Sequence, residues 1–452
     1  MARLWSLNLS RRIGLFFALA VWILLPSGPL NAMQPVQRVA LPNGLVVLTS
    51  EEHALPFVTF KLLIHAGARR DPSGLAGLAN LTARALLFGT KKQSMASINE
   101  QLDFMGASLS SEGTRDYAVI SLRLLKKDLK NGFELFTEVL TDPAFPAEEV
   151  KKEVTRTVAA IKASEDHPGQ VAEKAFIKAL YGDGPYGQPV IGTRESVEKI
   201  TAEAAREFYR SSYHPEGSIM VIVGDIREDT LKDLILPQLA KWQKGKAAVN
   251  TVEIGFEKGK KTVTIDRPLT QANLVLGHEG ITRDNPDFYA VTVMNYILGG
   301  GGLTSRLMEE VRTKRGLAYS VFSSFDAGKY QGSFQVVLQT KNASARDSIQ
   351  LAVGEMSRMR TEPVSDKELE GAKKYLIGSF PLRLITQERI AGFLMQVEYY
   401  GLGMDYAERY PGLIQAVTAE DVLKVAKAYL HPEAYILIVV ANLKEAGLEQ
   451  EH

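Results

Sequence analysis

Two related stretches decide the fold, His214-Pro-Glu-Gly-Ser-Ile-Met-Val-Ile-Val-Gly224 and His431-Pro-Glu-Ala-Tyr-Ile-Leu-Ile-Val-Val-Ala441. Each opens on His-Pro-Glu and runs into an apolar, β-branched segment that is typical of a buried strand. The second copy lies 217 positions after the first, and a Thr-Ala-Glu triplet precedes each copy by the same interval, at Thr201 and Thr418. A repeat at half the chain length indicates a duplicated domain rather than a short-period solenoid.

The composition agrees with two globular domains. The chain has 452 residues, of which 45% are apolar and 23% charged, so each half is large enough to bury its own core. A stretch rich in Lys and Gly, 244–261, is the predicted linker. We therefore expect a duplicated α+β fold, with domains at 33–243 and 262–452.

The N-terminus carries the features of an export signal. Arg3, Arg11 and Arg12 precede an apolar run, 13–25, which is short for a membrane span of ~20 residues. Cleavage after Ala32 is predicted, which makes 1–32 a signal peptide and the mature chain periplasmic. The alternative is an uncleaved signal anchor, the one way in which we expect this chain to contact a membrane.

Charge and residue usage exclude several function classes. A net charge of +1 gives no general attraction to nucleic acid. The absence of cysteine excludes disulfides, thiolate catalysis and thiolate metal ligands. The two repeated histidines, His214 and His431, are each followed by Pro and have no His or Glu partner at helical spacing. We interpret both as residues of an exposed turn before the last strand rather than as metal ligands.

The second half contains a glycine run followed by a helix and a strand. The run is Gly299, Gly300, Gly301 and Gly302, where another backbone could approach closely. The helix is expected to bury one face, formed by Leu303, Leu307 and Val311 with Met308 at its margin, and to end at Gly316. A short strand is predicted from Leu317 to Phe325.

Arg312 lies late in this predicted helix and Tyr319 lies in the strand, seven residues on. A fixed cation and a phenol could point together at one carbonyl or one developing oxyanion. Taken singly, Arg312 is more often a solvated helix residue, and Tyr319 a half-buried strand residue. The glycine run does not fit a phosphate-binding loop, because the Lys-Ser/Thr ending is missing.

The segment Arg312-Thr-Lys-Arg-Gly-Leu-Ala-Tyr319, after Ser305-Arg306-Leu307, resembles the Arg/Tyr motif of the pitrilysin/insulinase-type (M16) metallopeptidases. The resemblance extends over nearly the whole mature chain. It implies two homologous α+β domains, each an antiparallel-rich sheet packed with several helices, as in the LuxS/metallohydrolase-like fold. It also implies that Arg312 and Tyr319 bind substrate backbone and stabilise the tetrahedral intermediate.

The same family carries an inverted zinc motif, His-x-x-Glu-His, on the first long helix of its N-terminal half. Here the flanks of that motif remain, within a helix predicted over 75–88 with Ser73 as its N-cap. Gly77 and Leu81 stand at the histidine positions and Asn80 at the position of the general base. Ala160 stands at the position of the third ligand. We expect no zinc in this chain, because these side chains cannot coordinate a metal.

The resemblance therefore leaves three hypotheses. The first is a non-catalytic subunit of a heteromeric periplasmic zinc peptidase, which pairs with a His-x-x-Glu-His-bearing subunit that holds the zinc and acts with it on a peptide. In this hypothesis the glycine run, 299–302, belongs to the substrate-binding surface and lets the peptide slide past. The second is a peptide-binding or scaffold protein of the M16 fold without catalysis, since an edge strand can capture an extended peptide without zinc. The third is a stand-alone metallopeptidase, which would need ligands that the sequence does not offer.

Overall fold

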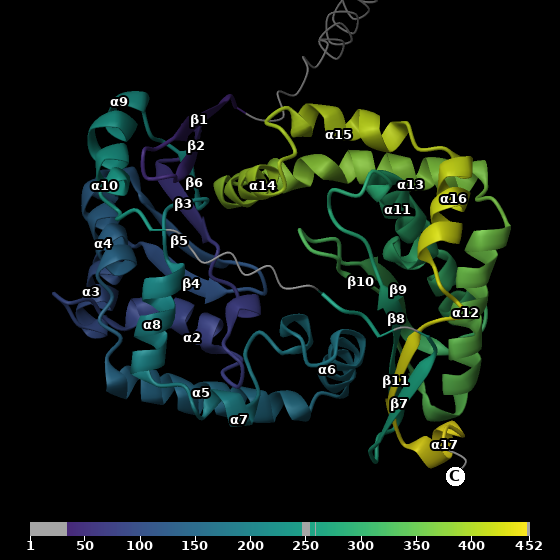
Figure 1. Cartoon of the computed structure of the whole chain (residues 1–452). Helices are drawn as coiled ribbons and strands as arrows, with labels where there is room; N and C mark the ends of the chain where they lie inside the picture. The colour runs from purple at the N-terminus through teal and green to yellow at the C-terminus, as the bar shows by residue number, and fades with distance from the viewer. Residues whose placement is uncertain (1–33, 246–253, 258, 450–452) are drawn as a thin grey trace, which may run out of the picture. The chain divides into compact units, whose positions relative to one another are not determined.

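The computed structural model describes residues 34–245, 254–257 and 259–449. The predicted signal peptide, 1–32, and part of the predicted linker fall outside these residues. From Pro35 onward the chain forms one unit that contains two sheets. Figure 1 shows both sheets with their helices. None of the helices in the described part of the chain is both long and apolar enough to cross a membrane.

The first sheet has six strands in the order β1-β2-β6-β3-β5-β4. Apart from the parallel pair β2/β6, neighbouring strands run antiparallel. The chain forms a hairpin through Asn43, in which Ala40 pairs with Val46. The strands of this sheet are β1 (Val36–Ala40), β2 (Val46–Glu51), β3 (Phe57–Ile64), β4 (Ser108–Gly113), β5 (Ala118–Leu125) and β6 (Ile219–Gly224).

The second sheet has five strands in the order β7-β11-β8-β10-β9. It repeats the first sheet strand for strand without β1, including one parallel pair, β7/β11. The two predicted apolar strands are confirmed as β6 and β11, which hold the same place in their sheets. The strands are β7 (Lys261–Asp266), β8 (Gln271–Glu279), β9 (Ala318–Phe325), β10 (Ser333–Lys341) and β11 (Ile436–Ala441).

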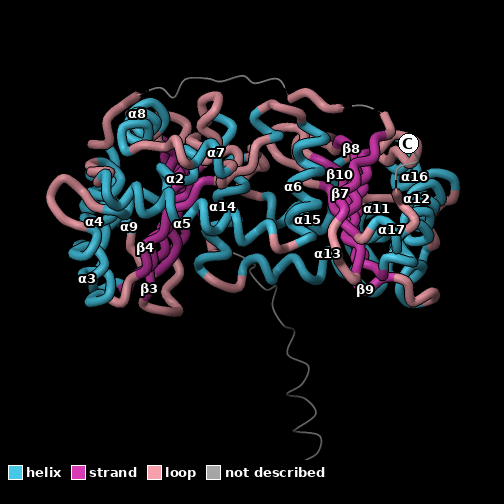
Figure 2. The backbone as a smooth tube through the Cα atoms, turned by 90° about the horizontal axis from the view of Figure 1, so that it is seen from below, coloured by secondary structure: helices cyan, strands magenta, loops and turns pink. Residues whose placement is uncertain are grey.

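Helices cover both sheets, and Figure 2 shows the strands of each sheet lying between helices. In the first half, the fully buried rings of Phe60, Phe133 and Phe136 meet between β3 and α4, with centroids 5.1–6.4 Å apart. The helices of this half are α2 (Leu78–Ala85), α3 (Met95–Met105), α4 (Leu129–Thr141), α5 (Ala147–Glu165), α6 (Pro168–Tyr181), α7 (Arg194–Val197), α8 (Ala202–Ser212), α9 (Glu228–Thr230) and α10 (Leu236–Ala240).

The helices of the second half follow a similar plan, and Thr418 caps α16 as Thr201 caps α8. This agrees with the repeat of Thr-Ala-Glu in the sequence. The helices are α11 (Phe288–Asn295), α12 (Ala345–Thr361), α13 (Asp366–Ser379), α14 (Gln387–Tyr399), α15 (Tyr406–Gln415), α16 (Ala419–Tyr429) and α17 (Leu443–Ala446).

One helix of each half packs on the sheet of the other half. Helix α14 packs on β3 and β6 of the first sheet, and α6 packs on β8 and β11 of the second. On α6 the buried ring of Phe176 lies directly over Gly277, where an added Cβ would approach ring carbons to 2.7 Å. Glu398 of α14 accepts hydrogen bonds from Arg38 of β1. The apolar cover of each sheet is therefore completed by the other half of the chain.

Candidate functional site

A π-helix, η9 (Met308–Thr313), follows the glycine run. Leu307 and Val311 are fully buried, as predicted. The prediction for Leu303 was wrong, because 67% of its surface is exposed. A separate 3-10 turn, η8 (Gly302–Thr304), holds this residue, so the spacing of the helix does not extend back to it. The helix therefore presents a shorter buried face than the sequence indicates.

Gly316 ends the helical segment in a left-handed conformation, with φ +62°, as predicted. Its N–H donates to the carbonyl of Arg312 at 2.8 Å, and the N–H of Leu317 donates to the carbonyl of Val311. These bonds satisfy the last carbonyls of the helix and turn the chain into β9. The predicted strand is confirmed from Ala318 to Phe325.

Tyr319 is the extra residue of a β-bulge. Ala318 pairs with Thr340 of β10, whereas Ser320 pairs with Gln339, so no residue of β10 lies opposite Tyr319. A bulge turns the side chain of the extra residue away from the regular alternation of the strand. Tyr319 is accordingly 72% exposed, between a buried Ala318 and a half-buried Ser320.

Arg312 and Tyr319 come together at this turn. The guanidinium carbon of Arg312 lies 5.7 Å from the centre of the Tyr319 ring, and both side chains are exposed. A cation beside an aromatic ring at this distance is weakly held, so both groups keep their hydrogen-bond donors available. The predicted pairing of these two residues is therefore present in the structure, with the donors in solvent.

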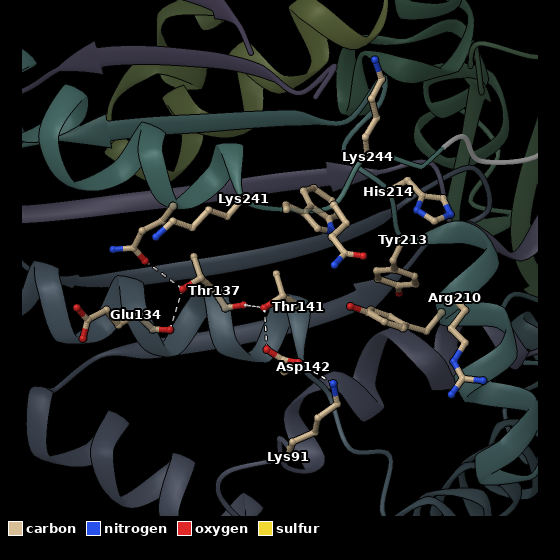
Figure 3. Close-up of a pocket in the computed structure, with 14 residues that line it drawn as sticks. Lys91, Glu134, Thr137, Thr141, Asp142, Arg210, Tyr213, His214, Lys241 and Lys244 are labelled. Carbon is tan, nitrogen blue, oxygen red and sulfur yellow. Dashed lines mark hydrogen bonds and ion pairs between the residues drawn. The ribbon is translucent and has the colours of Figure 1, made fainter. Parts of the chain in front are cut away.

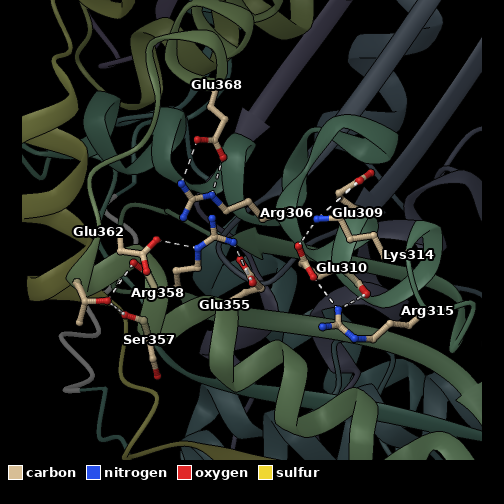
Figure 4. Close-up of polar contacts among 11 residues, drawn as sticks. Arg306, Glu309, Glu310, Lys314, Arg315, Glu355, Ser357, Arg358, Glu362 and Glu368 are labelled. Carbon is tan, nitrogen blue, oxygen red and sulfur yellow. Dashed lines mark hydrogen bonds and ion pairs between the residues drawn. The ribbon is translucent and has the colours of Figure 1, made fainter.

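The neighbouring carboxylates already have partners, as Figure 4 shows. Glu310 accepts from Lys314 and from Arg315, each at 2.6 Å, and these hydrogen bonds lower the pKa of the Glu310 carboxyl. Glu368 of α13 accepts two hydrogen bonds from Arg306, which is 7% exposed. Among the described residues, no carboxylate forms an ion pair with Arg312. The surrounding charges thus leave this guanidinium free for a ligand.

The four glycines lie between α11 and η9 in different environments. Gly299 is buried, and an added Cβ would approach the backbone nitrogen of Ser323 in β9 to 2.5 Å. At Gly301 a Cβ would meet the carbonyl of Tyr296 at 2.7 Å, and Gly300 faces Asn295. Gly302 has φ +58° and open space beside it. Gly299 therefore allows the segment after α11 to pack closely against β9. A role of the glycine run in peptide binding remains a prediction.

The first zinc-motif position, Gly77, lies outside the helix. Helix α2 begins at Leu78 rather than at Leu75, and Ser73 does not cap it, so this part of the prediction was wrong. The carboxylate of Asp71 caps the helix instead, because it accepts the N–H groups of Gly77 and Ala79 at 2.7 Å each. Gly77 has φ +97°, and a Cβ there would lie 2.7 Å from the carbonyl oxygen of Ile191. The backbone at this position disfavours any side chain, including histidine.

The other positions of the motif hold a buried side chain, a hydrogen-bonded side chain and an exposed alanine. Leu81 is buried, and the side-chain amide of Asn80 donates to the carbonyl of Gly113 in β4 at 3.0 Å. A Cβ on Gly113 would lie 2.7 Å from the Cα of Asn80, so helix and strand are in close contact. Ala160 is exposed on α5, which packs against α2. These side chains do not fit a zinc ion, and the described residues contain no group of three His, Asp or Glu placed to hold a metal.

Comparisons with known proteins agree with this geometry. The family model described as Insulinase (Peptidase family M16) matches 46–194, and the model described as Peptidase M16 inactive domain matches 199–376. A crystal structure of the peptidase M16 inactive domain from Pseudomonas fluorescens is 30% identical and covers 90% of this chain, with 98% of its own chain aligned and a TM-score of 0.84. The chain belongs to peptidase family M16.

Relatives of this M16 protein include both zinc proteases and non-peptidases by name. An uncharacterized zinc protease of Streptomyces coelicolor is 28% identical, and the match covers 92% of both chains. A non-peptidase homolog of Helicobacter pylori is 27% identical over 91% of this chain and 94% of its own. The match to an inactive domain and the non-peptidase relative indicate a non-catalytic M16 protein.

Two polar arrangements in this M16 protein were not predicted from the sequence. The first is the pair of Arg306 and Glu368, although Ser365-x-x-Glu368 is a recognisable capping-box signature and the structure contains that box. The second is the imidazole of His278, whose Nε2 accepts the backbone N–H of His431 at 3.1 Å. The prediction that His214 and His431 lie in an exposed turn was wrong in one respect, since both are half-buried.

Proposed function

We propose that this chain is the non-catalytic subunit of a two-chain periplasmic M16 zinc peptidase. The observation that carries the proposal is the contrast between its two halves. In the second half, Arg312 and Tyr319 present donors together that have no acceptor among the described residues, whereas Gly77, Asn80 and Leu81 offer no metal ligands in the first half. A partner with His-x-x-Glu-His would hold the zinc and activate water, and peptide would bind between the two subunits.

The contribution of this chain would be electrostatic. The Arg312 guanidinium and the Tyr319 hydroxyl can donate hydrogen bonds to the oxygen of a tetrahedral intermediate, where negative charge develops. Loss of one such donor in other enzymes costs about 3 kcal/mol, or ~100-fold in rate. The bulge at Tyr319 supports this role, because bulges next to active sites re-aim a side chain.

The strand that carries Tyr319 is suited to an extended peptide. β9 is the last strand of its sheet, and its outer edge has no strand partner in the described part of the chain. Near Tyr319, Phe322 is 46% exposed and lies opposite Val337 of β10. Val337 packs at the margin of the apolar cluster that α6 forms with β8 and β11. An added peptide strand could pair with this edge and place one apolar side chain near Phe322.

The same edge favours a second candidate function. Strand addition needs no metal, so the chain could bind peptides or act as a scaffold without a catalytic partner. The exposed pair of Arg312 and Tyr319 argues for the first function, since a scaffold has no evident need of two free donors aimed from neighbouring elements.

Recovery of the native partner distinguishes the two functions. The full-length gene with a C-terminal tag is expressed in its own cells, and the protein is recovered from the periplasmic fraction after mild cross-linking. We expect a mature N-terminus at Met33 and a co-purifying protein of similar size with His-x-x-Glu-His. Recovery of this chain alone, or of envelope proteins without that motif, would overturn the two-chain peptidase and favour the scaffold.

A further inference from the structure

The cavities of the two halves differ in how their cations lie. In the first half, a cavity of about 730 Å³ lies beside the end of α4, and Figure 3 shows Arg210, Lys241 and Lys244 extending away from one another at its wall. These side chains do not converge on one ligand group. In the second half, by contrast, three arginines border one groove beside the C-terminal end of β9, together with aromatic rings.

This groove consists of two adjoining hollows of about 310 and 420 Å³, which share Arg383, Phe393 and Gln396 as lining residues. The first hollow starts at Phe325, the last residue of β9, and lies between this strand end and α11, α14 and α15. The second continues along the first turns of α14 as far as Leu382. Both volumes fall within the range of ligand pockets in proteins.

Aromatic rings form much of the wall of the first hollow. They come from four parts of the second half and belong to Phe288, Phe325, Phe393, Tyr400, Tyr406 and Tyr410. The centroids of the Tyr406 and Tyr410 rings lie 6.0 Å apart, and that of Phe393 lies 6.1 Å from that of Tyr406. Rings held at these distances support one another, so this wall is apolar and is formed before a ligand binds.

Two arginines reach this wall from different elements. Arg283, between β8 and α11, donates to the Oη of Tyr406 at 2.9 Å, and its guanidinium carbon lies 3.7 Å from the ring centre of Phe288. Arg383, which precedes α14, has its guanidinium carbon 5.8 Å from the ring centre of Tyr410. Burial raises the pKa of the Tyr410 hydroxyl, and both guanidinium charges oppose this rise. The two cations therefore approach the same pair of neighbouring tyrosines.

The arginines of the groove have no carboxylate partner. Arg283, Arg383 and Arg389 form no ion pair among the described residues, and Arg389 donates instead to the carbonyl of Leu382 at 2.7 Å. One acid, Asp326, lines the groove, and it too has no ion pair within the described part of the chain. Three arginines against one aspartate leave an excess of two positive charges. Charge complementarity therefore favours an acidic ligand.

We infer that this groove binds an acidic segment of the peptide that adds to the edge of β9, an inference that rests on the proposed binding of peptide at that edge. Strand and groove are continuous, because Phe325 ends the strand, and Asp326 and Ala327 line the groove after it. A peptide paired along β9 from Tyr319 covers about 20 Å, or about six residues, before it reaches the groove. There its carboxylates would accept hydrogen bonds from the arginines, and an apolar side chain between them would lie against the rings.

Labelled peptides test the inference on the purified mature chain, 33–452, without a partner subunit, since binding at the edge needs no zinc. An added strand can run in either direction, so two probes are used, Thr-Val-Thr-Val-Thr-Val-Glu-Phe-Glu and Glu-Phe-Glu-Val-Thr-Val-Thr-Val-Thr. Each has a neutral counterpart with Gln in place of Glu. Fluorescence anisotropy at constant ionic strength measures the four affinities. We expect one acidic probe to bind ~10-fold more tightly than its neutral counterpart.

The exposed arginines of the groove are the residues to vary. Arg383→Gln and Arg389→Gln, combined in one variant, should weaken binding of the acidic probe ~10-fold and leave that of the neutral probe unchanged. Both side chains are exposed, so the fold should persist. The matched control is Arg346→Gln on α12, because Arg346 is also exposed and donates to a backbone carbonyl, that of Gly447, but does not line the groove. Its affinity for both probes should equal that of the parent.

The outcomes separate this inference from the proposed function. Equal binding of the acidic and neutral probes would overturn the groove as a site for acidic residues, while peptide binding at the edge of β9 would stand. The same conclusion follows if the double variant keeps the preference for Glu, or if Arg346→Gln loses it to the same extent. If none of the four peptides binds, both the groove and the proposed peptide edge are wrong.

Discussion

The guanidinium carbon of Arg312 lies 5.7 Å from the ring centre of Tyr319, across the turn made by Gly316. Arg312 lies in the last turn of a π-helix and Tyr319 occupies a β-bulge, so two irregular elements set their spacing. Both irregularities expose polar groups at the edge of a sheet, and such features are often found at functional sites. The geometry therefore supports a shared ligand for these two side chains.

The first prediction concerns Arg312→Ala and Tyr319→Phe. Each should lower turnover by the reconstituted two-chain peptidase by ~100-fold, because each removes one donor to the oxyanion. The free energy of unfolding of this chain should change by less than about 0.5 kcal/mol, since both side chains are exposed. Peptide hydrolysis and urea unfolding measure the two effects separately.

Arg315→Ala is the control for this pair of variants. Arg315 is also exposed and lies three residues from Arg312, but its guanidinium binds Glu310 at 2.6 Å. Turnover should stay within about twofold of the parent. If Arg312→Ala and Tyr319→Phe both turn over peptide as fast as the parent, the role proposed for these residues in catalysis is wrong.

The second prediction concerns the ion pair of Arg306 and Glu368 behind the π-helix. Partial burial alone would raise the pKa of the Glu368 carboxyl, but hydrogen bonds from Arg306 and Ser365 lower it to about 2. A depressed pKa stabilises the fold above the ordinary value of 4.5, and this contribution is lost as the pH falls from 4.5 towards 2. Because the carboxylate is partly exposed, we expect about 1–2 kcal/mol.

Urea unfolding of Glu368→Gln at pH 7 and at pH 3 checks this expectation. The variant should be less stable at pH 7, and its stability should fall less than that of the parent on acidification. Glu362→Gln is the control, because Glu362 also binds an arginine, Arg358 at 2.9 Å, but its side chain is 59% exposed. Its effect should stay below about 0.5 kcal/mol. Equal losses of unfolding free energy in the two variants would contradict the structural role of the ion pair between Arg306 and Glu368.

The sequence predicted the parts of the fold that depend on local patterns. The strands at Ile219–Gly224 and Ile436–Ala441, the stop at Gly316 and the strand after it follow from apolar runs and from one glycine. The bulge at Tyr319 could not be predicted, because it depends on the register with β10, which lies later in the chain.

The sequence also indicated which positions of the family site had been replaced, but not how the chain fills them. Helix α2 begins at Leu78 rather than at Leu75, because the Asp71 carboxylate accepts the N–H groups of Gly77 and Ala79. This contact depends on the path of the loop. In the same way, Arg306 forms an ion pair with Glu368, which lies 62 positions later in the sequence. Tertiary contacts of this kind leave no periodic signal.

The third prediction is a loss of stability in weak acid through His278. Burial lowers the pKa of this imidazole to about 3, from an ordinary value of 6.5. The unfolded chain therefore binds the proton more readily than the folded chain between these values. Stability from this group is fully present above pH 6.5 and falls as the pH drops towards 3, by at most about 1.4 kcal/mol per pH unit.

His278→Gln tests this assignment, because glutamine can still accept the N–H of His431 but does not titrate. Between pH 6.5 and 5, its unfolding free energy should fall by about 1–2 kcal/mol less than that of the parent. His53→Gln serves as the control, since hydrogen bonds from His53 to Asp225 and Glu51 raise the pKa of that exposed imidazole. If His278→Gln keeps the acid sensitivity of the parent, another group is responsible.

The fourth prediction concerns the first zinc-motif position. Gly77 and Gly74 both have a positive φ, +97° and +80°, but only Gly77 has a backbone carbonyl where a Cβ would lie. Gly74→Ala should therefore cost about 1 kcal/mol through backbone strain alone, and Gly77→Ala about 2–4 kcal/mol. For the same reason, restoring the motif by Gly77→His, Asn80→Glu and Leu81→His should destabilise the fold and give no stoichiometric zinc. Urea unfolding and metal analysis measure both effects, and equal costs for the two alanine variants would show that the loop moves aside to accommodate a side chain.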